Sequence, residues 1–256
     1  MAPPEPAREV ARSGGSQSVA RPWVPEVPVA LEFNGLAYAV MMATPADLED
    51  FVCGFALTEG LVESVGQVDE IALAETDRGW IARATIAGLG VERLMERVRG
   101  RVAESSCGLC GIENLEAIAK PLPKVPARTA PASDAVFAAL DALKDRQPLN
   151  AATGAAHGAA FARPDGSLLL VREDVGRHNA IDKLVGAMAR DGQGLEQGFV
   201  VSTARCSYEI VEKVVRAGAV ALVTVSLPTS MAVERAKEAG LSLVCLARDD
   251  SFLQLT

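Results

Sequence analysis

The second half of the chain alternates between helix and strand patterns, and this alternation restricts the fold more than any other feature of the sequence. Helical segments are separated by short β-branched runs such as AVALVTVSL, which begins at Ala219. Such alternation predicts a largely parallel sheet covered by helices, with functional groups at the carboxyl ends of the strands. Helices are expected at 133–145, 179–189, 207–218 and 230–240, and strands at 155–174 (two, joined at Asp165-Gly166), 198–204, 219–227 and 241–247.

A proline-rich segment marks the best candidate for a domain boundary. KPLPKVPARTAPAS holds four prolines between Lys120 and Ser133. The sequence therefore predicts a disordered tail at 1–22, an N-terminal α+β domain at 23–125 that ends in a CGLCG loop, and a C-terminal α/β domain at 126–256. Ser133 is expected to cap the first helix of the C-terminal domain.

The N-terminal domain is predicted to contain two strand pairs and a helix. Asn34-Gly35 marks a hairpin in VALEFNGLAYAVMMA, and strands near 68–74 and 80–86 flank a second turn. Between them, TPADLEDFVCGFALTEG carries the start and stop signals of a helix, with Thr44 as the N-cap, Pro45 in the first turn and Gly60 at the end.

Charge and hydropathy exclude several classes of protein. The net charge of -8 argues against a general nucleic-acid binder, which needs a basic surface. No run approaches the roughly 18 apolar residues of a membrane helix, and the first 22 residues lack the apolar core of a signal peptide. With five cysteines and no export signal, we expect a cytoplasmic protein whose thiols are reduced.

Cys107 and Cys110 form a C-x-x-C pair, each followed by glycine, in ESSCGLCGIENLEAI. A structural zinc site needs about four ligands, and the chain has no second pair to supply them, so no metal site is predicted. A redox disulfide and a mobile, sulfur-carrying thiolate both remain open, as does a turn without chemistry. The other cysteines and histidines are isolated in the sequence, and Cys53 and Cys245 are interpreted as inert core residues: Cys53, Cys206, Cys245, His157 and His178.

A second cluster of polar residues lies in VREDVGRHNAIDKLVG, where an apolar strand gives way to a helix. One reading is a solvated helix start with an i,i+4 pair between His178 and Asp182. The other is an anion site, because Gly176 permits a tight turn and a helix N-terminus beside Arg177 attracts negative charge. A zinc deaminase is disfavoured, since His157 is not followed by the H-x-E and P-C-x-x-C signature.

Several long motifs, in one order, resemble the FdhD family, the sulfur carriers needed for formate dehydrogenase activity. They are TPADLEDFVCGFALTEG, SSCGLCGIENLEAI, TGAAHGAAF, REDVGRHNAIDKLVGA, STARCSYEIVEKVVRAG and VSLPTSMAVERAKEAGLSLV. The resemblance runs from about Leu31 to the C-terminus. It implies a small N-terminal domain and a C-terminal α/β domain related in shape to cytidine deaminases, working as a homodimer.

The resemblance also implies a function. Members take persulfide sulfur from a cysteine desulfurase and deliver it to the molybdenum cofactor, in its bis-guanine-dinucleotide form, before that cofactor enters apo formate dehydrogenase. GDP-like nucleotides are expected to mimic this cargo. Cys107 matches the family's persulfide-bearing cysteine, and Cys110 would assist it. The alternatives are a cofactor-binding chaperone without sulfur transfer and a thiol-disulfide oxidoreductase.

The family's cofactor-contacting segment corresponds to the residues after the last core strand. Here two aspartates stand where glycine or proline is frequent, and their carboxylates would repel a pyrophosphate. Ser251 replaces a frequent arginine, and Cys206, where many relatives have a small residue, is interpreted as a bystander. The segment comprises Leu246, Ala247, Arg248, Asp249, Asp250 and Ser251, and charge alone adds Arg172, Arg177 and Arg205 as candidate phosphate or guanine contacts.

Overall fold

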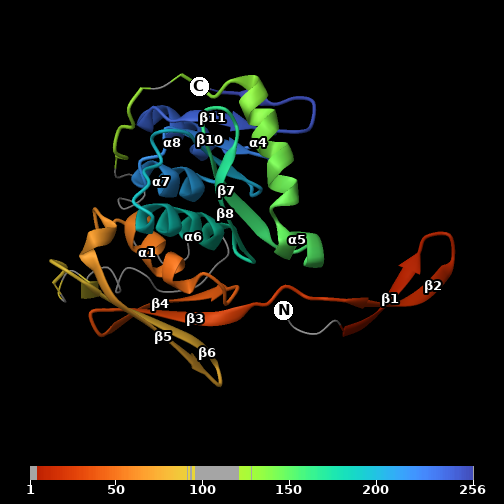
Figure 1. Cartoon of the computed structure of the whole chain (residues 1–256), viewed down its shortest axis with the longest axis horizontal. Helices are drawn as coiled ribbons and strands as arrows, with labels where there is room; N and C mark the ends of the chain where they lie inside the picture. Colours follow the sequence, from red (N-terminus) through yellow and green to blue (C-terminus); the bar gives the residue numbers. More distant parts are fainter. Residues whose placement is uncertain (1–4, 91, 93, 96–120, 128, 256) are drawn as a thin grey trace.

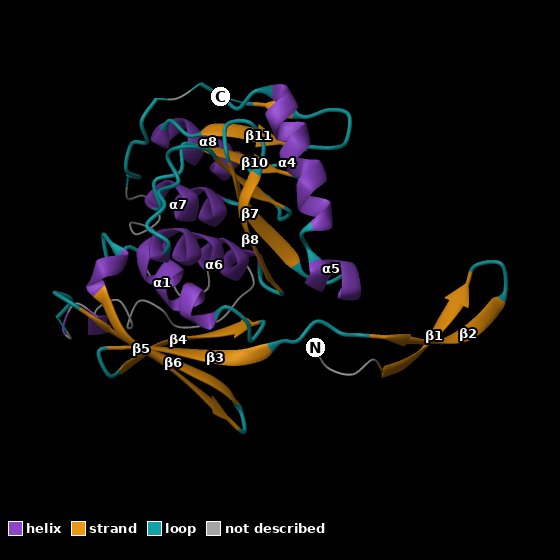
Figure 2. Cartoon of the chain, viewed as in Figure 1, coloured by secondary structure: helices purple, strands orange, loops and turns teal. Residues whose placement is uncertain are grey.

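Two β-sheets, one from each half of the chain, lie on either side of a pair of packed helices (Figures 1 and 2). The computed structural model describes residues 5–90, 92, 94–95, 121–127 and 129–255. Among the helices in these ranges, none combines the length and the hydropathy that crossing a membrane requires.

The N-terminal half forms a four-stranded sheet in the order β4-β3-β6-β5 with one helix on its inner face. Asn34 and Gly35, both at positive φ, make the tight turn of the first hairpin, as the sequence predicts. In the core, Phe55 of the helix stacks on Phe33, and Phe51 meets the ring of Phe55 edge-on. The elements are β3 (Val27–Phe33), β4 (Leu36–Ala43), α1 (Leu48–Thr58), the 3-10 helix η1 (Val65–Gln67), β5 (Val68–Thr76) and β6 (Gly79–Ile86).

The C-terminal half forms a mixed six-stranded sheet in the order β12-β11-β10-β9-β7-β8. Its elements are α4 (Ser133–Asp145), α5 (Pro148–Thr153), β7 (His157–Ala162), β8 (Leu168–Asp174), α6 (Arg177–Arg190), β9 (Phe199–Ser202), α7 (Tyr208–Arg216), β10 (Ala221–Thr224), α8 (Ser230–Ala239), β11 (Ser242–Cys245) and β12 (Leu253–Gln254). Strands β9, β10 and β11 are parallel, whereas β7, β8 and β12 join antiparallel. Helices α6, α7 and α8 pack on one face and α4 on the other, which confirms the predicted α/β class.

Two glycines let α1 and α6 approach until their backbones touch. A Cβ at Gly54 would lie 1.6 Å from the carbonyl oxygen of Asp182, and one at Gly186 would lie 1.9 Å from that of Asp50. Any larger side chain at either position would force the helices apart. This contact joins the two halves of the chain.

A buried polar network fixes the same junction at the start of α6. The ammonium of Lys183, which is fully buried, contacts the carboxylate of Asp174 at 2.6 Å and the carbonyl of Thr44 at 2.9 Å. Asp174 also accepts hydrogen bonds from the Thr44 amide and the Asn179 side chain, and Asn179 donates to the Met42 carbonyl. Each charge is therefore paired and hydrogen-bonded, as burial demands.

Two of the predicted helix caps are wrong. The N-cap of α1 is Asp47, in the left-handed region at φ 52°, because the hydroxyl of Thr44 instead accepts a hydrogen bond from the amide of Val175. Helix α4 has Ala132 at its N-cap, and Ser133 is the first helical residue. The tertiary contact outcompetes the local capping preference at Thr44.

The predicted disordered tail contains a β-hairpin. Strands β1 (Glu5–Ala11) and β2 (Gly15–Arg21) pair antiparallel, with Gly14 at φ 85° in the turn. Polar cross-strand pairs support it, including a 2.7 Å bond between Gln17 and Glu9. The sequence signal is weak because the side chains are polar and exposed on both faces. Figure 1 shows the hairpin projecting away from the two sheets.

The segment that precedes the predicted boundary at 125 packs against the C-terminal half. Leu122 and Val125 belong to the apolar core under α6, α7 and α8, and the Val125 amide donates to the carbonyl of Ala239 at the end of α8. Residues 121–125 therefore contribute to the C-terminal core, although the prolines place them with the N-terminal domain.

Candidate functional site

The carboxyl edge of the six-stranded sheet brings together most of the residues that the sequence singles out. Because β9, β10 and β11 are parallel, the segments that follow them meet at one edge. These segments carry Arg205, Pro228 and Leu246. Strand β7 runs antiparallel to β9 and starts at this edge with His157, which pairs in register with Asp174 at the end of β8.

Two exposed arginines lie on this edge. Arg205 follows β9 and Arg248 follows β11, and both are exposed to solvent. Within the described residues, neither guanidinium makes a hydrogen bond or an ion pair, so both are available to a phosphate or a carbonyl oxygen. The structure thus places two of the four predicted arginine contacts where an anion could reach them.

Two helices present their N-termini at the same edge. Helix α6 begins at Arg177 after Gly176, and α7 begins at Tyr208 after Ser207; neither has a side-chain N-cap. Helix α8, in contrast, is capped by the Thr229 hydroxyl. First-turn amides and the helix dipole favour a negative group at α6 and α7. Arg177, half-buried, adds its charge at the first of these positions.

The pKa values of both histidines are lowered near these arginines. Burial, followed by the charges of Lys213 and Arg177, lowers the pKa of His178 to about 3. Burial and the charges of Arg177 and Arg205 also lower the pKa of His157. Asp182 binds Lys213 at 2.9 Å, and not His178 as one reading of the sequence proposes, and burial raises the pKa of the Asp182 carboxyl.

The segment after β11 is held by backbone hydrogen bonds. The amides of Leu246 and Ala247 donate to the carbonyls of Ser226 and Thr224, and Leu246 adopts φ 49°. The Arg248 amide then donates to the Ser251 carbonyl, which closes a tight turn. The turn directs the chain back along β11 toward β12.

The sequence suggests that the carboxylates of Asp249 and Asp250 would repel a phosphate, but in the structure both carboxylates have hydrogen-bonding partners. Asp249 forms a 2.7 Å ion pair with Lys144 at the end of α4, and this hydrogen bond lowers the pKa of the Asp249 carboxyl. Asp250 accepts a hydrogen bond from the Ser251 hydroxyl. Lys144 therefore offsets part of the repulsion that a nearby phosphate would meet, and the sequence gives no local sign of this pairing.

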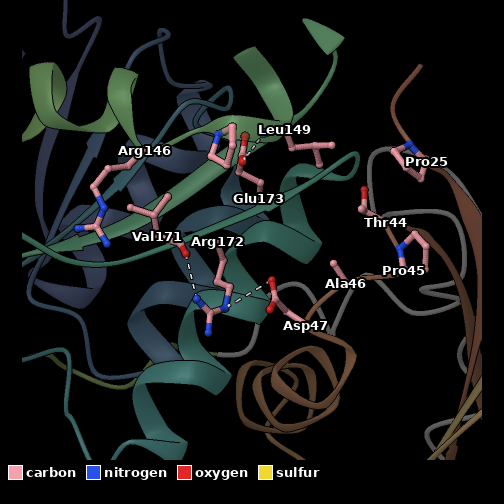
Figure 3. A pocket seen from close by; sticks show the side chains of 11 residues that line it. Pro25, Thr44, Pro45, Ala46, Asp47, Arg146, Leu149, Val171, Arg172 and Glu173 are labelled. Carbon is pink, nitrogen blue, oxygen red and sulfur yellow. Dashed lines mark hydrogen bonds and ion pairs between the residues drawn. The ribbon is translucent and has the colours of Figure 1, made fainter. Parts of the chain in front are cut away.

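Arg172, the fourth predicted contact, has a different environment. It lines a pocket of about 480 Å³ at the junction of the two halves, where it faces Asp47 at 3.7 Å (Figure 3). The Arg172 guanidinium also donates a 2.9 Å hydrogen bond to the carboxylate of Asp50. The carboxylate of the nearby Glu173 accepts hydrogen bonds from the backbone amides of Leu149 and Asn150. Arg172 thus links β8 to α1, and its charge is already matched by carboxylates.

The cysteines divide into two groups. Cys107 and Cys110 lie outside the described residues. Cys53, Cys206 and Cys245 are fully or almost fully buried, as expected for core residues. Cys206 and Cys245 both belong to the apolar core under α6, α7 and α8, whereas Cys53 lies on α1.

Comparison with known families agrees with this geometry. The model of the FdhD/NarQ family matches residues 24–256, which include both sheets and the whole carboxyl edge. The chain belongs to this family. Among curated members, it is 44% identical to the sulfur carrier protein FdhD of Variovorax paradoxus, over 92% of this chain and 85% of the relative. It is 45% identical to that of Cupriavidus necator, over 87% and 77%.

A solved structure supports the fold. A candidate formate dehydrogenase accessory protein from Desulfotalea psychrophila superposes with a TM-score of 0.74, covering 99% of this chain and 96% of the other. The sequence identity is 22%, so this match supports the arrangement of sheets and helices and nothing more specific. The α/β fold of the FdhD/NarQ family is thereby confirmed for this chain.

Proposed function

We propose that this protein is a sulfur carrier that takes persulfide sulfur from a cysteine desulfurase and delivers it to the molybdenum cofactor destined for formate dehydrogenase. The family match over residues 24–256, with relatives named as sulfur carriers, is the observation that carries this proposal. The cargo would be the bis-guanine-dinucleotide form of the cofactor, inserted afterwards into the apoenzyme. Cys107 would hold the transferred sulfur and Cys110 would assist it.

The carboxyl edge suits an anionic cargo of this kind. Arg205 and Arg248 are exposed and make no hydrogen bond to the described part of the chain, and neither α6 nor α7 has a side-chain N-cap. Charge-assisted hydrogen bonds from guanidinium to phosphate are among the stronger polar contacts. Lys144 reduces the negative field of Asp249 beside them. These features support a site for the phosphates and guanine of a dinucleotide.

The test is a persulfidation assay on the full chain. Incubation with a cysteine desulfurase and cysteine should add about 32 Da to the peptide that contains Cys107, as expected for one sulfur atom. Cys107→Ala should lose this gain and should fail to mature formate dehydrogenase, while it still binds GDP. Cys110→Ala serves as the matched control and should keep the added sulfur.

The other outcomes identify the alternatives. Full maturation by Cys107→Ala would rule out sulfur transfer at this residue and favour a cofactor-binding chaperone. A disulfide between Cys107 and Cys110 that cycles during turnover, without any added sulfur, would favour a thiol-disulfide oxidoreductase.

A further inference from the structure

The carboxylate of Asp250 is a hydrogen-bond acceptor at the carboxyl edge that the predicted phosphate contacts do not use. A backbone hydrogen bond from Arg248 to Ser251 closes a tight turn, and the two aspartates are its central residues. Lys144 binds Asp249 at 2.7 Å. Asp250 is exposed, and within the described residues its carboxylate accepts only the Ser251 hydroxyl, at 3.0 Å. Such a carboxylate would weaken a site that bound phosphate alone, so a ligand of this turn needs hydrogen-bond donors as well.

An exposed leucine lies between the two segments that carry the exposed arginines. A parallel bridge between Cys206 and Pro228 joins the segments after β9 and β10. Leu227 and Arg205 are the residues directly before this bridge, so they lie side by side. On the other side, the segment after β11 donates a 3.2 Å backbone hydrogen bond to the carbonyl of Ser226, next to Leu227. Leu227 is 56% exposed, and the flat face of a nucleotide base would cover this apolar side chain favourably.

We propose that Asp250 selects the guanine base of the cargo, which lies on Leu227 while its phosphates bind the arginines on either side. Guanine carries two adjacent donors on one edge, the N1 hydrogen and the N2 amino group, and a carboxylate accepts both at once. Adenine carries an unprotonated nitrogen at the same ring position, so the carboxylate repels its lone pair. This inference rests on the proposed function, because it assigns the base contacts of a guanine-dinucleotide cargo.

The sign of the Asp250 contribution separates base recognition from simple repulsion. A carboxylate in an exposed turn repels phosphate weakly, because solvent and salt screen its charge. Two hydrogen bonds from guanine to a charged acceptor outweigh that repulsion, since charge-assisted hydrogen bonds are among the stronger polar contacts. Removing the charge should therefore weaken binding of GDP and leave pyrophosphate, which has no base, bound at least as tightly. If the carboxylate only repelled phosphate, removing it would tighten binding of both ligands.

Isothermal titration calorimetry of the full chain with GDP, ADP and pyrophosphate tests the role of Asp250. Wild type should bind GDP about tenfold more tightly than ADP. Inosine diphosphate, which lacks the N2 amino group, should bind with an intermediate Kd. Asp250→Asn keeps the size of the side chain but replaces one acceptor with a donor. Its Kd for GDP should rise about tenfold, its preference for GDP over ADP should vanish, and its Kd for pyrophosphate should not rise.

Two further variants complete the test. Asp249→Asn, the matched control for charge, removes a carboxylate that Lys144 already binds and should change the Kd of GDP and of pyrophosphate by the same factor. Leu227→Ser should raise the Kd of GDP and of ADP alike, by about fivefold, because an apolar surface does not distinguish the two bases. It should leave pyrophosphate binding unchanged. Val40→Ser, at a site that is 47% exposed on β4 of the other sheet, is its control and should alter none of these values.

Three results would overturn the inference. The first is a wild-type protein that binds GDP no more tightly than ADP. The second is an Asp250→Asn protein that binds both GDP and pyrophosphate more tightly, which would make the carboxylate a repulsive group only. The third is a Leu227→Ser protein that loses pyrophosphate binding as much as GDP binding. Sulfur on Cys107 is measured by mass without any nucleotide, so failure of the sulfur-carrier proposal is distinguishable from each of these results.

Discussion

The ammonium of Lys183 lies 2.6 Å from the carboxylate of Asp174, and neither side chain is exposed to solvent. The pair lies where β4 and α1 of the first half meet β8 and α6 of the second. Removing it therefore tests how much this junction contributes to stability. Removing one member of a buried pair leaves the other charge without compensation. Lys183→Met should therefore lower the free energy of unfolding by about 3 to 5 kcal/mol, measured by urea titration. Lys144→Met, which breaks the exposed pair with Asp249, is the control and should leave stability unchanged within error.

The contact between α1 and α6 gives a second prediction. Helix propensity alone would make Gly54→Ala stabilising by up to about 1 kcal/mol. The added Cβ, however, would meet the Asp182 carbonyl at 1.6 Å, so we expect a loss of at least about 2 kcal/mol from overpacking. Gly15→Ala, where a Cβ would meet nothing within 4 Å, is the control. A Gly54→Ala protein with an unchanged midpoint in thermal unfolding would contradict this account of the junction.

Local sequence signals predicted most elements but few contacts between them. The turn at Asn34-Gly35, the strand at Ala221–Thr224 and the helix at Ser230–Ala239 follow from residues next to one another in the chain. Thr44 shows where local signals fail. Its hydroxyl accepts a hydrogen bond from the amide of Val175 in the other half, and so does not cap the helix that the sequence predicts it to cap. Nothing near Thr44 in the sequence indicates that partner.

The candidate site shows the same division. Its position follows from the order of strands, because parallel strands collect their carboxyl ends at one edge, and Arg205 and Arg248 follow two of these strands. Which charges remain available could not be predicted, because this depends on tertiary partners. Arg172 is bound by Asp50, and Asp249 by Lys144. A charge count treats all of these residues alike.

The N-terminal hairpin should be dispensable for the fold. Strands β1 and β2 pair only with each other among the described strands, and the family match begins at residue 24. An isolated two-stranded hairpin has marginal stability. A chain that lacks residues 1–22 should unfold at the same temperature as the full chain, within about 2 °C by differential scanning calorimetry. A clearly lower temperature would indicate contacts between the hairpin and the sheets.

His178 should make stability depend on pH. Its folded pKa of about 3 lies below the ordinary value of 6.5, so between these values the unfolded chain binds the extra proton. This contribution to stability is complete above pH 6.5 and is lost as the pH falls toward 3, with a slope of up to about 1.4 kcal/mol per pH unit. His178→Phe keeps a ring and removes the titration, so its stability should fall less steeply from pH 6.5 to 4.5 in urea titrations. His157→Phe, at a half-buried site, should change the slope less, and equal slopes in wild type and His178→Phe would contradict the assignment.

The exposed arginines of the carboxyl edge should control binding of a guanine nucleotide. Arg205→Ala and Arg248→Ala each remove a guanidinium that has no hydrogen bond within the described residues, so binding should suffer while folding does not. For GDP as the probe, isothermal titration calorimetry should show a Kd about tenfold higher for each variant, as expected for the loss of one charge-assisted contact of about 1.4 kcal/mol. Arg163→Ala is the matched control, since Arg163 is also exposed but follows β7 at the opposite edge of the sheet. Arg172→Ala should instead lower stability, because it breaks the pair with Asp50 that joins β8 to α1. If Arg163→Ala weakened GDP binding as much as Arg205→Ala, GDP binding would depend on the overall surface charge. That result would contradict a GDP site at the carboxyl edge.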